Sequence, residues 1–184
     1  MLVPGRAVSF HLSWKCSRPA VMTDSAFPAA LAQALAAAGD RIILTAGPRH
    51  LSGHALANEI ERWAAGLATL GVSRGERVAV QAEKSLDVVL LYLATLRLGA
   101  LYLPLNTAYR SAELAYFLED AQPVLFVCDP AAAAAAAAAA TTTGAGQGGG
   151  TRTLTLGANG EGSLAEVIGN DHPAAPVVAV DAGD

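Results

Sequence analysis

A short polar stretch, Asn106–Arg110, directly follows an apolar run and offers the first candidate for chemistry. Its asparagine, threonine, tyrosine and arginine can all form hydrogen bonds. Open α/β sheets bind their ligands just past the carboxyl ends of their strands, so this is where a site is expected. A structural role is the stronger expectation, because short polar turns are far more common than sites. In that case Asn106 shapes the turn and Ser111 caps the next helix.

The other reactive residue types form no recognisable catalytic arrangement. Glu83 and Lys84 precede a helix and are expected to be solvated loop charges, while Glu113 suits the positive end of a helix. The sequence has no GxSxG, HExxH or CxxC motif and no GxGxxG after a strand. The histidines and cysteines are scattered and lack metal-type spacing: His11, His50, His54, His172, Cys16 and Cys128. The sequence therefore assigns no catalytic, cofactor-binding or metal-binding residue.

The elements that would position such a site alternate along the stretch from Gly71 to Pro130. Three apolar strands are predicted at Val78–Gln81, Leu101–Leu105 and Val124–Cys128, with helices at Ser85–Leu98 and Ser111–Asp120 between them. This alternation predicts an α/β fold, a partial doubly wound parallel sheet with crossover helices. Pro104 cannot donate a hydrogen bond to a neighbouring strand, so its strand must end there or lie at the edge of the sheet.

The same stretch resembles the N-terminal part of the AMP-forming acyl-CoA synthetases, which are adenylate-forming ligases. Within that family it is most similar to malonyl-CoA and methylmalonyl-CoA synthetases, mainly through Glu83–Ser85 and Leu103–Tyr109. The resemblance covers residues 40 to 130 and, more loosely, Thr151 to Asp184. The segments that carry it are Leu70–Val72, Gly75–Val80, Glu83–Ser85, Leu103–Tyr109, Glu113–Leu114 and Val127–Pro130.

The resemblance implies ATP, Mg²⁺ and coenzyme A as reactants and a small carboxylic acid as substrate. It also implies a Thr/Ser/Gly-rich phosphate loop with a lysine, located after a strand. Thr141–Gly146 imitates that composition but follows polyalanine and has no nearby lysine, so it is not expected to bind phosphate. Asp181–Asp184 resembles residues that precede the family's phosphate loop. The chain alone is therefore expected to be a truncated, inactive part of such an enzyme.

Two further helices are predicted before and within this stretch. Ala29–Ala38 forms a weak helix closed by Gly39, followed by a strand at Arg41–Ala46 and a turn at Gly47-Pro48. Ser52 is expected to cap a longer amphipathic helix that ends at Gly71, with Trp63 in the core. Its apolar face is spaced by three and four residues: Leu56, Ile60, Trp63, Leu67 and Leu70.

The helical run Val88–Leu96 is apolar nearly all round, which favours burial between layers. Nine residues are too few to cross a bilayer, and no transmembrane segment is predicted. If the layer that covers this helix is missing, its apolar surface should be exposed. That exposure leaves two alternatives to an enzyme open: a non-catalytic, truncated relative that acts as a protein-interaction module, or an unstable fragment.

Composition divides the chain into four parts. Residues 1–23 are a basic extension, interpreted either as an organellar transit peptide or as an upstream extension with Met22 as the working start. Residues 24–130 form the N-terminal α/β part of the AMP-binding domain. Residues 131–150 are a low-complexity Ala/Thr/Gly linker. Residues 151–184 continue the domain, with a strand from Thr151, a helix at Ser163–Asn170 capped by Ser163, and a strand at Pro176–Val180.

Charge and cysteine content indicate which partners and which cellular compartment to expect. The net charge is −4 without a basic cluster, so no nucleic-acid partner is expected. Two cysteines in unrelated contexts favour a reduced, intracellular protein, either cytoplasmic or mitochondrial. The 184 residues suit a single domain, and no protein partner can be named.

Overall fold

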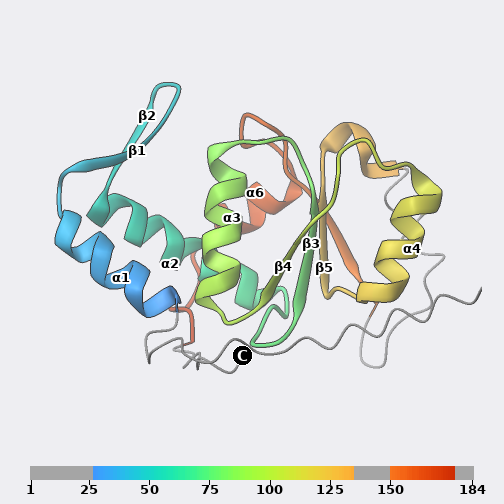
Figure 1. Cartoon of the computed structure of the whole chain (residues 1–184), viewed down its shortest axis with the longest axis horizontal. Coiled ribbons are helices and arrows are strands. Elements are labelled where there is room, and N and C mark those ends of the chain that lie inside the picture. The colour runs from blue at the N-terminus through green and yellow to red at the C-terminus, as the bar shows by residue number, and fades with distance from the viewer. Residues whose placement is uncertain (1–26, 135–149, 177–184) are drawn as a thin grey trace, which may run out of the picture.

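The computed structural model describes residues 27–134 and 150–176, and Figure 1 shows a parallel sheet between helices. The helices are α1 (Phe27–Ala38), α2 (Gly53–Thr69), α3 (Leu86–Arg97), α4 (Ser111–Ala121), the short 3₁₀ helix η1 (Pro130–Ala132) and α6 (Ser163–Gly169). The strands are β1 (Ile42–Ala46), β2 (Arg49–Ser52), β3 (Arg77–Gln81), β4 (Leu101–Pro104), β5 (Leu125–Cys128) and β6 (Arg152–Thr155).

The main sheet has the strand order β4-β3-β5-β6, and every neighbouring pair is parallel. Figure 1 shows α3 and α6 on one face and α4 on the other. Helices on both faces of a parallel sheet define a doubly wound α/β fold, so the predicted fold class is confirmed.

Side chains that alternate along the strands feed two separate cores. Val78 and Val80 of β3 point into the core shared with α2, α3 and α6. Ala79 and Phe126 point the opposite way, into a smaller core under α4. Because both faces of β3 and β5 are covered, these strands read as continuous apolar runs.

Helix α2 begins and ends at the residues that the sequence predicts, and α3 begins with a serine cap of the same kind. The Oγ atoms of Ser52 and Ser85 accept hydrogen bonds from Ala55 N and Val88 N, each at 3.2 Å. Gly71 adopts φ +90°, which lets Val72 N donate to Leu67 O at 3.2 Å and closes α2. Trp63 is 2% exposed, as expected for a core residue. Its Nε1 has no hydrogen-bond partner among the described residues.

Pro104 ends β4, and β4 is an edge strand, so both parts of that prediction are confirmed. Leu101 N donates to Glu76 O at 2.7 Å and Leu105 N donates to Val80 O at 2.8 Å. Alternate amides of a strand point the same way, so the nitrogen of Pro104 lies on the outer side of β4.

The strand predicted at Arg41–Ala46 pairs with a second strand that the sequence reading missed. β1 and β2 form an antiparallel hairpin, with Ala46 opposite Arg49 across the two residues Gly47 and Pro48. Gly47 has φ +57°, which suits the first position of a two-residue hairpin turn. β2 is short and starts with Arg49 and His50, so it lacks the apolar alternation that signals a strand.

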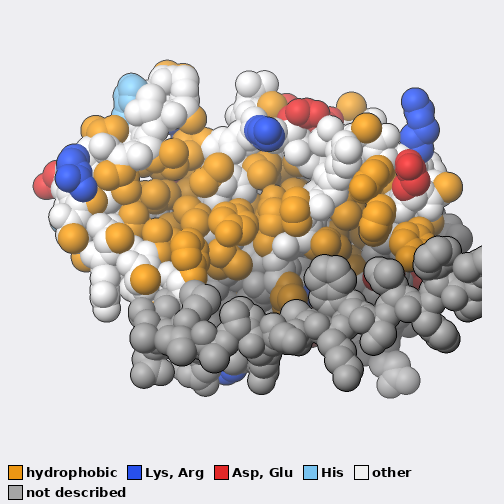
Figure 2. All heavy atoms as spheres, viewed as in Figure 1, with side chains coloured by type: hydrophobic (Ala, Val, Ile, Leu, Met, Phe, Trp, Pro, Cys, Tyr) orange, Lys and Arg blue, Asp and Glu red, His pale blue; other side chains and the backbone are white. Residues whose placement is uncertain are grey.

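Helix α3 is buried on one side only, so the expectation that it is buried all round is wrong. The exposure of apolar surface that was expected if a covering layer is missing is observed. Val89 and Tyr92 are exposed, as is Leu101 at the start of the adjacent β4. The ring of Tyr92 packs edge-to-face on Tyr102 at 5.1 Å. Figure 2 shows hydrophobic side chains gathered over α1, α3 and β4 on this side of the molecule.

Candidate functional site

The strand order reverses direction between β3 and β5. From β3 the chain moves outward to β4 at the edge, then crosses back to β5 on the other side of β3. In doubly wound sheets, ligands bind in the crevice outside the carboxyl ends of the strands at such a point. Gln81 and Cys128 are the last residues of these two strands and are paired in register.

Gln81 connects the segments that leave two neighbouring strands. Its side chain donates from Nε2 to Asn106 O at 2.9 Å and to Tyr109 O at 3.1 Å, after β4. Its backbone oxygen accepts from Asp129 N at 3.2 Å, after β5. The residue is 4% exposed. Sequence reasoning missed it, although one signal was available: it is the polar residue that ends an otherwise apolar strand.

The stretch Asn106–Arg110 is a tightly held turn, which confirms the structural role expected for Asn106. Asn106 Oδ1 accepts from Ala108 N at 2.9 Å, and Tyr109 N donates to Asn106 O at 3.0 Å. The Tyr109 ring stacks on Phe117 with centroids 5.1 Å apart. The side chains of Thr107 and Arg110 remain exposed beside the carboxyl edge.

The start of α4 differs from the prediction in one residue. Arg110, not Ser111, is the N-cap, and Ser111 is the first helical residue. Glu113 Oε2 accepts from Arg110 N at 2.9 Å, so the glutamate satisfies an amide at the helix start. Its expected structural role at the positive end of the helix is confirmed.

An open hollow lies beside this turn and has a volume of about 450 Å³. Its walls are Tyr109, Ala112, Glu113, Tyr116 and Phe117. Tyr116 is 64% exposed and packs edge-to-face on Phe117 at 5.5 Å. The turn held by Gln81 thus also forms part of an aromatic surface on the α4 side.

Cys128 is fully buried, and burial is the main reason that the pKa of its thiol rises from 9.0 to about 11, with a smaller contribution from Asp129. The thiol therefore stays protonated near neutral pH and is a poor nucleophile. Asp129 Oδ1 accepts from Ala131 N at 2.8 Å and starts η1. Both residues have structural roles at the end of β5.

Asp87 is a second buried polar residue near the carboxyl edge that sequence reasoning did not single out. Its Oδ1 lies 2.7 Å from Arg49 Nη1, which joins the β1–β2 hairpin to the first turn of α3. A Cβ atom on Gly160 would lie 2.6 Å from Asp87 Oδ2, so only glycine permits this approach. Glu83 and Lys84, just before α3, are exposed as predicted.

The segment after β6 is fixed by two hydroxyl groups. Thr155 N donates to Ser163 Oγ, and Ser163 N donates to Thr155 Oγ1, each at 3.0 Å. The predicted cap of α6 is therefore wrong: Gly162 is the N-cap, and the Ser163 side chain binds back to β6. The Ser163 hydroxyl accepts from the amide of Thr155 in β6 and does not cap the first turn of α6.

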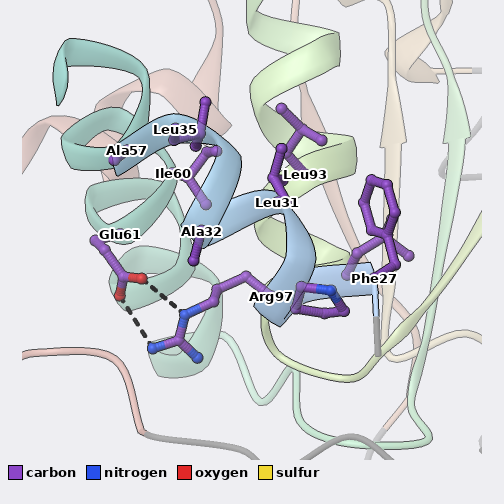
Figure 3. Close-up of a pocket in the computed structure, with 11 residues that line it drawn as sticks. Phe27, Leu31, Ala32, Leu35, Ala57, Ile60, Glu61, Leu93 and Arg97 are labelled. Atoms are coloured by element: carbon purple, nitrogen blue, oxygen red, sulfur yellow. Dashed lines mark hydrogen bonds and ion pairs between the residues drawn. The ribbon is translucent and has the colours of Figure 1, made fainter. Parts of the chain in front are cut away.

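A small apolar cavity of about 50 Å³ lies elsewhere, between α1, α2 and α3 (Figure 3). Arg97 Nε, at its rim, lies 2.7 Å from Glu61 Oε1. Arg97 ends α3, and α3 runs opposite to the strands, so the cavity lies toward their amino ends. It is separate from the carboxyl edge, and its two charged lining residues, Glu61 and Arg97, are paired with each other. The lining residues are Phe27, Pro28, Leu31, Ala32, Leu35, Ala57, Ile60, Glu61, Leu93, Leu96 and Arg97.

The described histidines bind separate partners and not one another. His50 pairs with Thr45, His54 with Asp40, and His172 with the backbone of Val167. Within residues 27–134 and 150–176, no group of three or more His, Cys, Asp or Glu side chains could hold a metal ion. None of the helices in those ranges is long and apolar enough to cross a bilayer.

Several predicted features lie outside the described residues and stay predictions. They are the basic extension with His11 and Cys16, the loop-like Thr141–Gly146, most of the strand Pro176–Val180, and Asp181–Asp184.

Comparison with known proteins agrees with this architecture. Residues 31–177 match the family model described as AMP-binding enzyme. The 2,3-dihydroxybenzoate-AMP ligase of Bacillus subtilis is 36% identical over 93 residues, which are 50% of this chain and 17% of that protein. The chain thus spans about a sixth of this relative.

Solved structures give the same result. ATP-bound MatB of Rhodopseudomonas palustris superposes with a TM-score of 0.68 and is 37% identical, covering 81% of this chain and 30% of MatB. A benzoate CoA ligase of Burkholderia xenovorans superposes with a TM-score of 0.69 over 86% of this chain and 31% of its own. Its 19% identity shows a shared fold alone.

The family model covers most of the chain, including all the strands of the parallel sheet and both helices that cross between them on opposite faces. The fold, the reversal between β3 and β5 and the match over residues 31–177 agree, and the chain belongs to the AMP-binding enzyme family.

Proposed function

We propose that this chain supplies the first part of the nucleotide-binding domain of an AMP-forming acid–thiol ligase. In that reaction a carboxylate oxygen attacks the α-phosphorus of ATP, and pyrophosphate leaves. The thiol sulfur of coenzyme A then attacks the acyl carbon of the adenylate, and AMP leaves. The observation that carries the proposal is the family match over residues 31–177.

We further propose malonate or methylmalonate as the acid. MatB, a malonyl-CoA synthetase, is 37% identical to the chain, whereas the benzoate CoA ligase is 19% identical over a similar share. The segments Glu83–Ser85 and Leu103–Tyr109, which resemble malonyl-type enzymes, both lie at the carboxyl edge of the sheet. Support for this acid is therefore the higher overall identity to MatB, together with the resemblance of these two segments at the carboxyl edge.

No step of the reaction is assigned to a described side chain. The transferring phosphate needs cations and fixed hydrogen-bond donors around it. The described residues offer no group of acids or histidines for Mg²⁺, and the buried thiol of Cys128 is protonated. Their part in the proposed reaction is to build the strand ends and turns that border the crevice.

The proposal can be tested by exchanging this chain's matched segment into MatB, a part equal to about 30% of MatB. A chimera that contains MatB sequence has been solved with ATP bound, so this scaffold tolerates segment exchange. Pyrophosphate release and acyl-CoA formation are measured with malonate, methylmalonate and benzoate. We expect ATP-dependent malonyl-CoA formation.

Each failure has a separate meaning. A folded chimera that releases no pyrophosphate with any acid would overturn the ligase proposal. A chimera that prefers benzoate, although the rest of its sequence is MatB, would overturn the choice of acid. The same exchange with the matched segment of the benzoate CoA ligase is the control for segment exchange itself.

A protein-interaction role is a second candidate, favoured by the exposed Val89, Tyr92 and Leu101 on α3 and β4. Exposed apolar side chains that gather on one surface mark interaction sites. Sedimentation velocity of the purified chain and its Tyr92→Lys variant tests this role. A wild-type chain that stays monomeric at high concentration, with the same behaviour as the variant, argues against self-association through this surface.

A further inference from the structure

We propose that Gln81 is a positioning residue for the reaction proposed above. Its carboxamide holds the turn Asn106–Arg110 in one conformation at the carboxyl ends of β3 and β4. The inference rests on the proposed function for its catalytic consequence, while the holding of the turn can be tested in this chain alone.

A buried glutamine at the end of β3 is energetically unfavourable unless its side chain is hydrogen-bonded. Val78, Ala79 and Val80 precede Gln81 in β3, and all are buried apolar residues. A leucine or methionine would fill the same space without that requirement. The glutamine is explained by its partners, the two backbone carbonyls of the turn.

The two carbonyl groups that Gln81 binds belong to one short turn. Asn106 and Tyr109 are the two ends of the hydrogen-bonded turn within Asn106–Arg110, which the bond from Tyr109 N to Asn106 O closes, so one side chain holds both ends. Four further restraints act on the same five residues. They are the hydrogen bond from Ala108 N to Asn106 Oδ1, the hydrogen bond from Tyr109 N to Asn106 O, the stacking of Tyr109 on Phe117, and the hydrogen bond from Arg110 N to Glu113. An exposed turn with this many restraints is fixed before any ligand arrives.

Gln81 lies at the carboxyl edge of the sheet, where a ligand is expected. Gln81 ends the strand that lies next to the reversal point, and its backbone oxygen also binds Asp129 N after β5. One residue therefore binds both the segment that follows β4 and the segment that follows β5, and so fixes their positions relative to each other. Groups that hold a reacting site within a fraction of an ångström matter because small misplacements of a substrate are costly in rate.

The first experiment measures hydrogen exchange in the turn of this chain. The backbone amides of Ala108, Tyr109 and Arg110 are hydrogen-bonded and report on its opening. In Gln81→Leu we expect these amides to exchange about tenfold faster, because the loss of one or two hydrogen bonds shifts opening by about that factor. Amides in α2 should keep their wild-type rates.

The control variant is Thr95→Val. Thr95 is also buried, and its Oγ1 donates to Leu91 O at 2.7 Å, but it lies in α3 on the other side of the sheet. The Thr95→Val substitution removes a buried side-chain hydrogen bond at a distance from the turn. Faster exchange of the turn in Thr95→Val, or unchanged exchange in Gln81→Leu, would overturn the holding role.

Gln81→Glu gives a readout that packing alone would not produce. An ionised carboxylate cannot donate to the two carbonyls, whereas the protonated acid can donate once. Protection of the turn, relative to wild type at the same pH, should therefore recover in part as the pH falls from about 7 to 5. The neighbouring Cys128, Asp129 and Tyr109 are common to all variants, so the ratio isolates residue 81. A flat ratio contradicts the proposal.

The second experiment uses the MatB chimera. In an active chimera, Gln81→Leu should lower kcat at least about tenfold while Thr95→Val leaves it near the parent value. Unchanged kcat in a folded Gln81→Leu chimera would overturn the catalytic consequence. An inactive parent chimera would instead overturn the proposed function. Hydrogen exchange in the turn of this chain would then decide by itself whether Gln81 holds the turn.

Discussion

Within the described residues, one face of the sheet carries a core of twenty buried residues under α2, α3 and α6, whereas the other carries six under α4. Helix α2 alone buries eight residues, and α4 buries two, Leu114 and Leu118. Burial of apolar area is the main favourable term in folding, so the first face holds most of the stability.

The turn at the proposed ligand edge belongs to the thinly covered face. Asn106–Arg110 leads directly into α4, and Tyr109 packs on that helix through Phe117. Elements with few buried contacts open locally at lower free energy than the core. Most of the stability therefore lies on one face of the sheet and the candidate site on the other, where polar contacts such as those of Gln81 compensate for a small core.

The largest effect should come from the well-covered face. Leu67→Ala removes a fully buried side chain of α2 and leaves a cavity. We expect the free energy of unfolding to fall by about 3 to 5 kcal/mol, measured by urea denaturation. Val89→Ala, on the exposed side of α3, is the control and should cost far less. Equal losses in the two variants would mean that this face is not the main source of stability.

A smaller and more local effect is expected under α4. Leu118→Ala removes one of the two buried side chains of that helix and should cost about 2 to 3 kcal/mol. Hydrogen exchange should show the loss of protection in α4 and in Asn106–Arg110, with α2 and α3 little changed. Loss of protection spread evenly over all helices would contradict the separation of the two faces.

Cys128, in the smaller core, should make stability depend on alkaline pH. Folding raises the pKa of its thiol from 9.0 to about 11, so the folded state holds the proton more tightly than the unfolded state. Its contribution is complete below pH 9 and is lost as the pH rises toward 11. Urea denaturation across this range should show a decline that is shallower in Cys128→Ala. An identical slope in both proteins would exclude this cause.

The smallest effect should come from the Arg49–Asp87 ion pair, which ties the β1–β2 hairpin to the well-covered face. The arginine side chain is 43% exposed, so solvent screens much of the attraction. A double-mutant cycle with Arg49→Met and Asp87→Asn should give a coupling energy of no more than about 1 kcal/mol. A coupling of several kcal/mol would place the hairpin among the main stabilising elements.

Sequence patterns predict the well-covered face closely because it depends on local signals. The cap Ser52, the left-handed Gly71 and the spacing that buries Trp63 are all confirmed. The hairpin strand β2 could not be predicted, because its pairing compensates for a polar sequence. The two wrong caps have a similar cause: Arg110 takes the place expected for Ser111, and Ser163 binds a strand amide far from its own helix.

The position of the candidate site could be predicted from the sequence, but the contact that holds its turn in place could not. The turn at Asn106–Arg110 lies at the carboxyl edge, as its location after a strand indicated. What holds the turn is a contact over 25 residues between Gln81 and Asn106, and no local pattern encodes such a contact. Only the fold brings β3 and the segment after β4 together.

Within the described residues, each outer strand of the four-stranded sheet has one outward nitrogen that cannot donate to a further strand. On β4 it is the nitrogen of Pro104, and on β6 it is the amide of Thr155, which is occupied by the hydroxyl of Ser163. Unpaired edges are templates for aggregation, and proteins commonly protect them with proline, side-chain caps and short strands. The serine that fails to cap its helix thus gains a second role: with Pro104, it discourages sheets of separate molecules from joining edge to edge.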